Sequence, residues 1–166
     1  GSPQVEAVLA GADGALEGLT EGSIVIDCST ALPNSTVRMA AAVAERGARM
    51  LDAAMTRTPR EAAEGRLNLL IGGDPGLLEI CRPILSAFAE AITHAGPIGS
   101  GHRMKLLHNF VSLGQFTLLA EAAACARLEG IGPEVFLDVV GGGGGGGTAL
   151  ERLRPFLASG DMAGMR

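Results

Sequence analysis

The 166-residue sequence predicts an α/β fold with a largely parallel sheet, followed by a long helix and a partial all-α domain. Two observations support this prediction. Short apolar runs rich in β-branched residues alternate with helical patterns over the first hundred residues, and the pattern becomes purely helical after Pro97. We therefore expect an α/β domain at residues 1–97, and at residues 98–166 a helical region that is incomplete at its C-terminal end.

The first region contains four expected strands, each a short apolar run. They are residues 23–27, 49–54, 67–71 and 91–94. Helices are expected at 34–46, ended by Gly47, and from the cap Asp74-Pro75 to about residue 89. Strands separated by helices indicate a parallel sheet covered on both faces, whose ligands bind at the carboxyl ends of strands. The segments to examine are therefore 27–30 and 55–58.

The helical region begins with a pattern that runs from residue 102 to about 129 and would span roughly 40 Å. No charge occurs between Lys105 and Glu121, but polar residues interrupt the segment and make it unsuitable for crossing a bilayer. We interpret it as the central helix of a domain or subunit interface, which predicts a homodimer or homotetramer assembled through the helical region. Further helices are expected at 133–140 and 148–157.

Composition excludes several classes of protein. The net charge is −5 and aromatic residues are only 3% of the chain, so the basic, stacking surface typical of nucleic-acid binding is not expected. No membrane segment is expected either. The three cysteines are far apart and form no CxxC pair, which indicates reduced thiols and a cytoplasmic location. The first two residues, Gly1-Ser2, are typical of a cloning remnant.

Seven consecutive glycines occupy positions 141–147. Such a run does not support a helix or a packed strand, because glycine loses the most backbone entropy on folding. The run contains GxGxxG, but it follows a helical pattern instead of a strand, which argues against a dinucleotide-binding loop. We expect a flexible connection, or a stretch whose true side chains are not represented.

Lys105 is the only lysine, and the other twelve of the thirteen basic residues are arginine. A lysine can release its proton near neutral pH when it is desolvated, whereas arginine stays charged. Lys105, Asn109 and Ser112 are spaced i, i+4 and i+7, which places a polar stripe on one face of the apolar helix. A stray lysine in an arginine-rich composition is the alternative interpretation.

Five motifs occur in an order that resembles the β-hydroxyacid dehydrogenases. This family includes 3-hydroxyisobutyrate dehydrogenase, tartronate semialdehyde reductase and, more distantly, 6-phosphogluconate dehydrogenase. The motifs are DCSTALP at 27–33, LDAAMT at 51–56, EGRL at 64–67 leading to IGG at 71–73, HAGPIGSG at 94–101, and KLLHN at 105–109. The resemblance covers most of residues 5–157.

The resemblance implies the C-terminal part of a Rossmann-type sheet and a cofactor that is NAD or NADP. It implies that Lys105 is the general acid/base for a small anionic hydroxyacid substrate and that Asn109 holds this substrate. Ser29 and Thr30 would meet the nicotinamide end of the cofactor, although a strand-to-helix cap is the alternative interpretation of that segment.

One departure from the family occurs after the second strand. Thr56, Arg57 and Thr58 stand where the family commonly has serine-glycine-glycine, and all three are candidate substrate-binding residues. Arg57 could hold a substrate anion through a bidentate pair, which would change the substrate accepted. A solvated arginine in a turn is the alternative.

A second departure is that the family's first strand and its GxGxxG turn are missing, so the chain resembles part of a longer enzyme. The choice between NAD and NADP depends on that missing part. Because the chain has no tyrosine, the tyrosine-dependent dehydrogenase classes are excluded. The alternative function is a non-catalytic scaffold homologue that serves as an oligomerisation or binding module.

Overall fold

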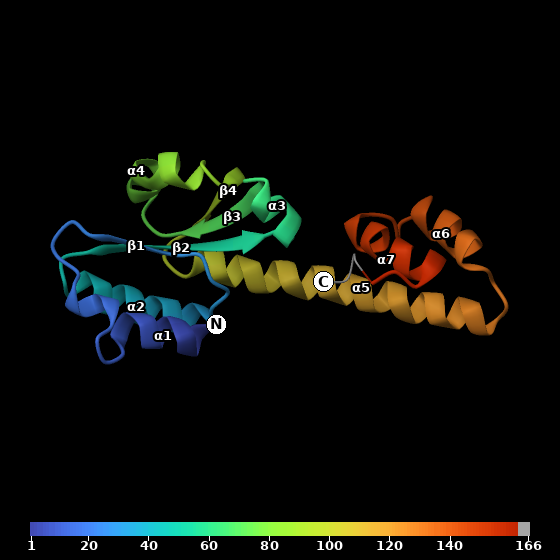
Figure 1. Cartoon of the computed structure of the whole chain (residues 1–166), viewed down its shortest axis with the longest axis horizontal. Helices are drawn as coiled ribbons and strands as arrows, with labels where there is room; N and C mark the ends of the chain where they lie inside the picture. Colours follow the sequence, from blue (N-terminus) through green and yellow to red (C-terminus); the bar gives the residue numbers. More distant parts are fainter. Residues whose placement is uncertain (163–166) are drawn as a thin grey trace. The chain divides into compact units, whose positions relative to one another are not determined.

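The computed structural model describes residues 1–162 and confirms the predicted α/β class (Figure 1). The chain divides into two compact units, one of residues 1–107 and one from residue 108 onward. The long helix α5 (Ser100–Leu128) contributes its first turns to the first unit and the rest to the second. The two units are described separately below.

The first unit contains a four-stranded sheet in the order β1-β2-β3-β4. The strands are β1 (Ile24–Asp27), β2 (Arg49–Thr56), β3 (Leu67–Gly72) and β4 (Ala89–Gly96). All four expected strands are present, and two of the three pairings are parallel, but β2 and β3 are antiparallel. The expectation of parallel strands was wrong at this pairing. The connection from β2 to β3 is only residues 57–66 and contains the five-residue helix α3 (Pro59–Ala63), whereas a parallel connection needs a crossover of about a dozen residues or more.

Helices cover both faces of this sheet, as Figure 1 shows. Helix α4 (Pro75–Leu85) packs on one face, where its Leu77 and Leu85 meet the inward side chains of β2 and β3. The predicted cap is confirmed, because the Asp74 carboxylate accepts a hydrogen bond of 2.7 Å from the Leu77 amide. Helix α4 ends at Leu85, four residues earlier than expected, since β4 already begins at Ala89.

The opposite face is covered by α1 (Ser2–Ala10) and α2 (Pro33–Ala44), with a short 3₁₀ turn, η1 (Ala15–Glu17), between α1 and β1. Their apolar contact with the sheet centres on Leu9, Val43 and Met50. Ser2 is buried, and its Oγ accepts a hydrogen bond of 2.8 Å from the Leu32 amide. The Ser2 side chain therefore joins the start of α1 to the segment that precedes α2.

The second unit is helical and has its own core. The later turns of α5 pack with α6 (Pro133–Gly141) and α7 (Thr148–Ser159) around Leu119, Leu137 and Leu150. The first glycine of the run ends α6, where the Gly142 amide donates to the Asp138 carbonyl at 2.9 Å, and the glycines that follow form turns. Within the described part of the chain, no helix is both long and apolar enough to span a membrane.

Candidate active site

The two candidate loops leave the sheet at different levels. In the parallel pair β1–β2, Asp27 is opposite Asp52, so β1 ends where β2 is only half complete. Strand β2 continues for four more residues, to Thr56, which corresponds to roughly 13 Å of extended chain. The loop after β1 therefore lies beside the middle of β2, and the loop after β2 lies beyond it.

Asp52 fixes the start of α5 on the sheet. The carboxylate is fully buried, and its two oxygens accept hydrogen bonds of 2.7 Å each from the backbone amides of Gly99 and His102. Amides in the first turn of a helix have no partner within the helix, so this carboxylate satisfies the His102 amide there and the Gly99 amide just before the helix. A Cβ at Gly101 would collide with the Leu70 carbonyl oxygen, which explains why glycine stands at this close approach.

Lys105 lies one turn beyond Gly101 on α5. Residues four apart share one face of a helix, so the Lys105 side chain leaves α5 from the face that packs on the sheet. Lys105 is partly buried, and this desolvation lowers the pKa of its amine below the usual range of a lysine. The amine can therefore exchange a proton closer to neutral pH. Asn109, also partly buried, follows one turn later on the same helix, in the second unit.

The loop after β1 is held from inside the protein. The Ser29 amide donates to Asp27 Oδ1 at 2.9 Å, and the Ser29 carbonyl oxygen lies 3.1 Å from His102 Nε2. Thr30 is exposed. Two buried oxygens of this loop, Asp27 Oδ2 and Ser29 Oγ, have no hydrogen-bond partner within residues 1–162. Unsatisfied polar atoms of this kind suit a polar ligand such as the amide or ribose of a nicotinamide nucleotide.

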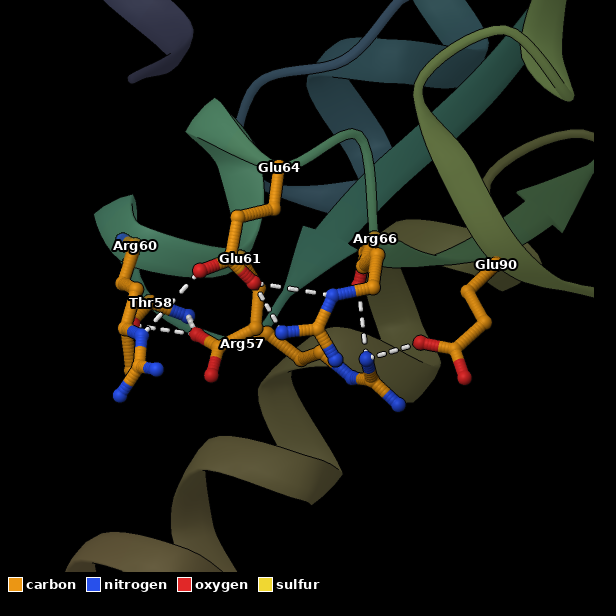
Figure 2. A network of polar contacts seen from close by, with 7 residues as sticks. All are labelled: Arg57, Thr58, Arg60, Glu61, Glu64, Arg66 and Glu90. Atoms are coloured by element: carbon orange, nitrogen blue, oxygen red, sulfur yellow. Dashed lines mark hydrogen bonds and ion pairs between the residues drawn. The ribbon is translucent and has the colours of Figure 1, made fainter.

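The loop after β2 is held by charges at the surface, as Figure 2 shows. Thr56 is buried at the end of the strand, and Arg57 follows with a backbone φ of 82°. This conformation favours glycine, the residue that the family commonly has here. The Arg57 guanidinium donates to the Arg66 carbonyl at 2.8 Å and to the Glu90 carboxylate. Its side chain is 30% exposed, so it is neither fully solvated nor buried.

Glu90 reaches Arg57 because of an irregularity in β4. Leu67 of β3 is opposite Ala89 and Asn68 is opposite Ala91, so the register skips Glu90. A bulge of this kind redirects a side chain away from the regular alternation of the strand, and bulges are frequent beside active sites. The redirected carboxylate forms the ion pair with Arg57 seen in Figure 2.

Thr58 has a structural partner of its own. Its hydroxyl accepts from the Arg60 amide at 3.3 Å, and its amide donates to Glu61 Oε2 at 3.1 Å. This reciprocal arrangement is a capping box that starts α3. The hydrogen bond from the Thr58 hydroxyl to Glu61 also lowers the pKa of that carboxyl group. Around this turn, Glu64 bridges Arg60 and Arg66 through exposed ion pairs.

Two residues of this region were not singled out from the sequence. Asp52 and His102 are both fully buried and join the sheet, the loop after β1 and the start of α5. The available signal for Asp52 was an acid inside an otherwise apolar strand, since such a group needs strong hydrogen-bond partners. The sequence contained no comparable signal for His102, because histidine occurs on both the buried and the exposed faces of helices.

Comparison with known proteins shows which family the chain resembles. Residues 1–96 match the family model described as the NAD binding domain of 6-phosphogluconate dehydrogenase. The chain is 32% identical over 161 residues to 2-(hydroxymethyl)glutarate dehydrogenase of Eubacterium barkeri, covering 96% of the chain and 54% of that protein. It is 36% identical over 138 residues to 3-sulfolactaldehyde reductase of Escherichia coli K12, covering 83% of the chain and 46% of that protein.

A solved structure gives the same result. The 3-hydroxyisobutyrate dehydrogenase of Mycobacterium tuberculosis, in a structure with L-serine, superposes with a TM-score of 0.82 at 27% identity. The match covers 93% of this chain and 51% of that one, so the chain spans about half the length of the relatives that it matches. The expected cofactor class, NAD or NADP, is confirmed by the domain match. From its motifs, its fold and these matches, the chain belongs to the β-hydroxyacid dehydrogenase family.

Proposed function

We propose that this chain contributes the cofactor-facing and substrate-facing residues of an NAD(P)-dependent dehydrogenase or reductase. The reaction interconverts a small 3-hydroxyacid and its semialdehyde or ketone. The observation that carries the proposal is the single lysine, partly buried one turn after a helix start that is fixed on the sheet, with its pKa lowered by desolvation. The names of two relatives, a 2-(hydroxymethyl)glutarate dehydrogenase and a 3-sulfolactaldehyde reductase, support the substrate class.

In this proposal Lys105 moves the proton. During oxidation the neutral amine takes the proton of the substrate hydroxyl, while the C–H bond breaks and its hydride passes to the oxidised nicotinamide. In the reverse direction the ammonium returns the proton to the carbonyl oxygen. Effective proton transfer needs a group with a pKa near the working pH, which is the direction in which burial shifts Lys105.

The other candidate residues hold and orient the reactants. Ser29 and Thr30 would contact the nicotinamide end of the cofactor, and the unsatisfied Ser29 Oγ supports this role. Asn109 would bind the substrate carboxylate or hydroxyl beside the lysine. In the loop after β2, the hydroxyl groups of Thr56 and Thr58 would bind a substrate anion. Thr58 could do so only after its hydroxyl breaks the hydrogen bonds that cap α3.

Arg57 would select substrates that have a second anionic group. Its Nη1 is engaged by Glu90 and the Arg66 carbonyl, whereas its Nε and Nη2 have no partner within residues 1–162. A carboxylate or sulfonate could bind those N–H groups in a bidentate pair, or displace Glu90. One relative has a name whose substrate includes a second anionic group, the dicarboxylate 2-(hydroxymethyl)glutarate.

The test uses the full-length natural protein and a panel of small 3-hydroxyacids with NAD and NADP. Wild type should oxidise at least one of them, and Lys105→Met should lower kcat about a thousandfold with the fold intact by circular dichroism. The matched control is Arg103→Met, which removes an exposed cation from the neighbouring turn and should keep wild-type rates. Equal rates in wild type and Lys105→Met would contradict the proposed role of Lys105. A wild type that oxidises none of the hydroxyacids would support the alternative, a non-catalytic scaffold.

We also propose that the protein is cytoplasmic and assembles as a homodimer or homotetramer through its helical region. The three cysteines are free, as expected in a reducing compartment. In the second unit α5 exposes large apolar side chains, including Phe110 at 80% and Leu118 at 73%. Light scattering of the full-length protein should give a multiple of the subunit mass, and Phe110→Glu should reduce it. A monomeric wild type would contradict the assembly.

A further inference from the structure

His102 lies fully buried where three elements of the first unit meet. Its Nδ1 is 2.7 Å from Thr36 Oγ1 on α2, and its Nε2 is 3.1 Å from the Ser29 carbonyl oxygen in the loop after β1. A carbonyl oxygen only accepts hydrogen bonds, so Nε2 carries a hydrogen and donates. The ring is therefore fixed in orientation, and one specific donor of α5 holds the backbone of the loop.

The backbone of the same residue is fixed on the sheet. The His102 amide donates to Asp52 Oδ2, and the Gly99 amide donates to the other oxygen of that buried carboxylate. The first turn of α5 is thus attached to β2 by its amides and to the loop after β1 by the imidazole. Lys105 follows three residues later, about 4.5 Å along the helix axis.

The loop after β1 has few other internal attachments. The Asp27 carboxylate holds the Ser29 amide through Oδ1, while its Oδ2 lies 3.9 Å from His102 Nε2 and has no hydrogen-bond partner in the described chain. The donation from His102 is consequently the bond that ties the Ser29 carbonyl to the helix that carries the lysine. Without it, the carbonyl would be buried and unpaired, or the loop would move.

We infer that His102 is a positioning residue that sets the spacing between the Ser29–Thr30 loop and Lys105. This inference rests on the proposed function, in which that loop meets the nicotinamide and Lys105 meets the substrate hydroxyl. Hydride and proton leave neighbouring atoms of one substrate, so their two acceptors must be held at matched positions. A misplacement of about 1 Å is enough to lower turnover a hundredfold.

The test compares four variants of the full-length natural protein. His102→Leu removes both ring hydrogen bonds at similar volume, and His102→Asn keeps an amide that is too short to reach the Ser29 carbonyl. His102→Gln retains a donor long enough to reach it. The matched control, Thr36→Val, removes only the bond to α2. Each variant is measured for NADH and NADPH affinity by nucleotide fluorescence, and for kcat, KM and thermal unfolding.

We expect His102→Leu and His102→Asn to weaken dinucleotide affinity about tenfold and to lower kcat about a hundredfold, with KM for the hydroxyacid unchanged. His102→Gln should recover most of both losses, and Thr36→Val should stay near wild type. If His102→Leu fails to fold, the comparison of His102→Asn with His102→Gln still tests the inference. A merely structural role would not give these two variants different dinucleotide affinities.

Several outcomes would overturn the inference. Wild-type dinucleotide affinity in His102→Asn would do so, and so would equal losses in His102→Asn and His102→Gln, or a loss in Thr36→Val as large as that in His102→Leu. A wild type that binds NAD(P)H but oxidises no hydroxyacid contradicts the proposed function alone, since the affinity comparison still tests His102. A wild type that binds no dinucleotide overturns both.

Discussion

The loops after β1 and β2 both follow parallel strands, yet the protein holds them by different physical means. The first is attached through buried hydrogen bonds to Asp27 and His102. The second is attached through exposed ion pairs that centre on Arg57 and Glu64. Buried polar contacts are costly to break, whereas surface ion pairs contribute little and are screened by salt. The loop proposed to meet the common cofactor is thus the rigidly supported one, and the loop proposed to meet the variable substrate is weakly held.

The largest expected effect is on stability, and it compares the buried carboxylate that holds the start of α5 with a surface ion pair of the loop after β2. Asp52→Ala leaves the buried amides of Gly99 and His102 without a partner and should lower the free energy of unfolding by about 3 kcal/mol. Glu90→Ala removes one partly exposed ion pair and should lower it by less than about 1 kcal/mol. Urea denaturation of both variants measures this contrast. If the two variants lose similar amounts of unfolding free energy, the proposed contrast between buried hydrogen bonds and surface ion pairs is wrong.

Substrate selection should depend on the weakly held loop. In Arg57→Gly, KM for hydroxyacids with a second anionic group should rise about tenfold, the loss of one charge-assisted contact, while KM for simpler hydroxyacids stays constant. Glycine adopts the φ of 82° without strain, so the fold should be kept. Arg60→Gln, which changes an exposed cation nearby, is the control and should alter neither constant. If Arg57→Gly leaves KM unchanged for both kinds of hydroxyacid, the Arg57 side chain has only a structural role, through its ion pair with Glu90.

The pH dependence of turnover should reflect Lys105. In the proposed mechanism oxidation requires the neutral amine, so kcat for oxidation should rise with pH through the pKa of Lys105, and kcat for reduction should fall. Because burial lowers this pKa, both changes should occur below the usual range of a lysine. Between the lowered folded pKa and the ordinary unfolded one, the unfolded state binds more protons, so stability should also rise with pH there. A profile that persists in Lys105→Arg would assign the titration to another group.

The smallest expected effect is the response of the two loops to salt. Raising the ionic strength to about 1 M shortens the screening length to about 3 Å, which weakens exposed ion pairs more than buried hydrogen bonds. Amide exchange of residues 57–66 should therefore accelerate slightly in high salt, while exchange of residues 27–30 stays constant. Hydrogen exchange with mass spectrometry resolves the two segments, and equal responses would show that they are held alike.

Much of the fold could be predicted from the sequence because local chemistry determines it. The β-branched runs became strands, and Asp74-Pro75 began a helix through the expected cap. The direction of β3 could not be predicted, because an apolar strand has the same pattern in either direction and the connection between β2 and β3 looked long enough for a helix.

The candidate site was predicted less completely. Lys105 stands out through composition, and the loops through their place after strands. The role of Asp52 and His102 depends on contacts between residues about 50 positions apart, which no local pattern contains. The positive φ of Arg57 could not be predicted either, because a non-glycine residue does not indicate a left-handed backbone conformation.

The reversal between β2 and β3 has a consequence for how this protein can diversify. Because β3 and β4 run back along the sheet, their beginnings, not their ends, border the turn that follows Thr56. Residue 66, just before β3, and residue 90, at the start of β4, are thereby neighbours of residue 57. Exchanges at those two positions would change the charge beside residue 57 while Lys105, α5 and the loop proposed to meet the cofactor keep their own contacts.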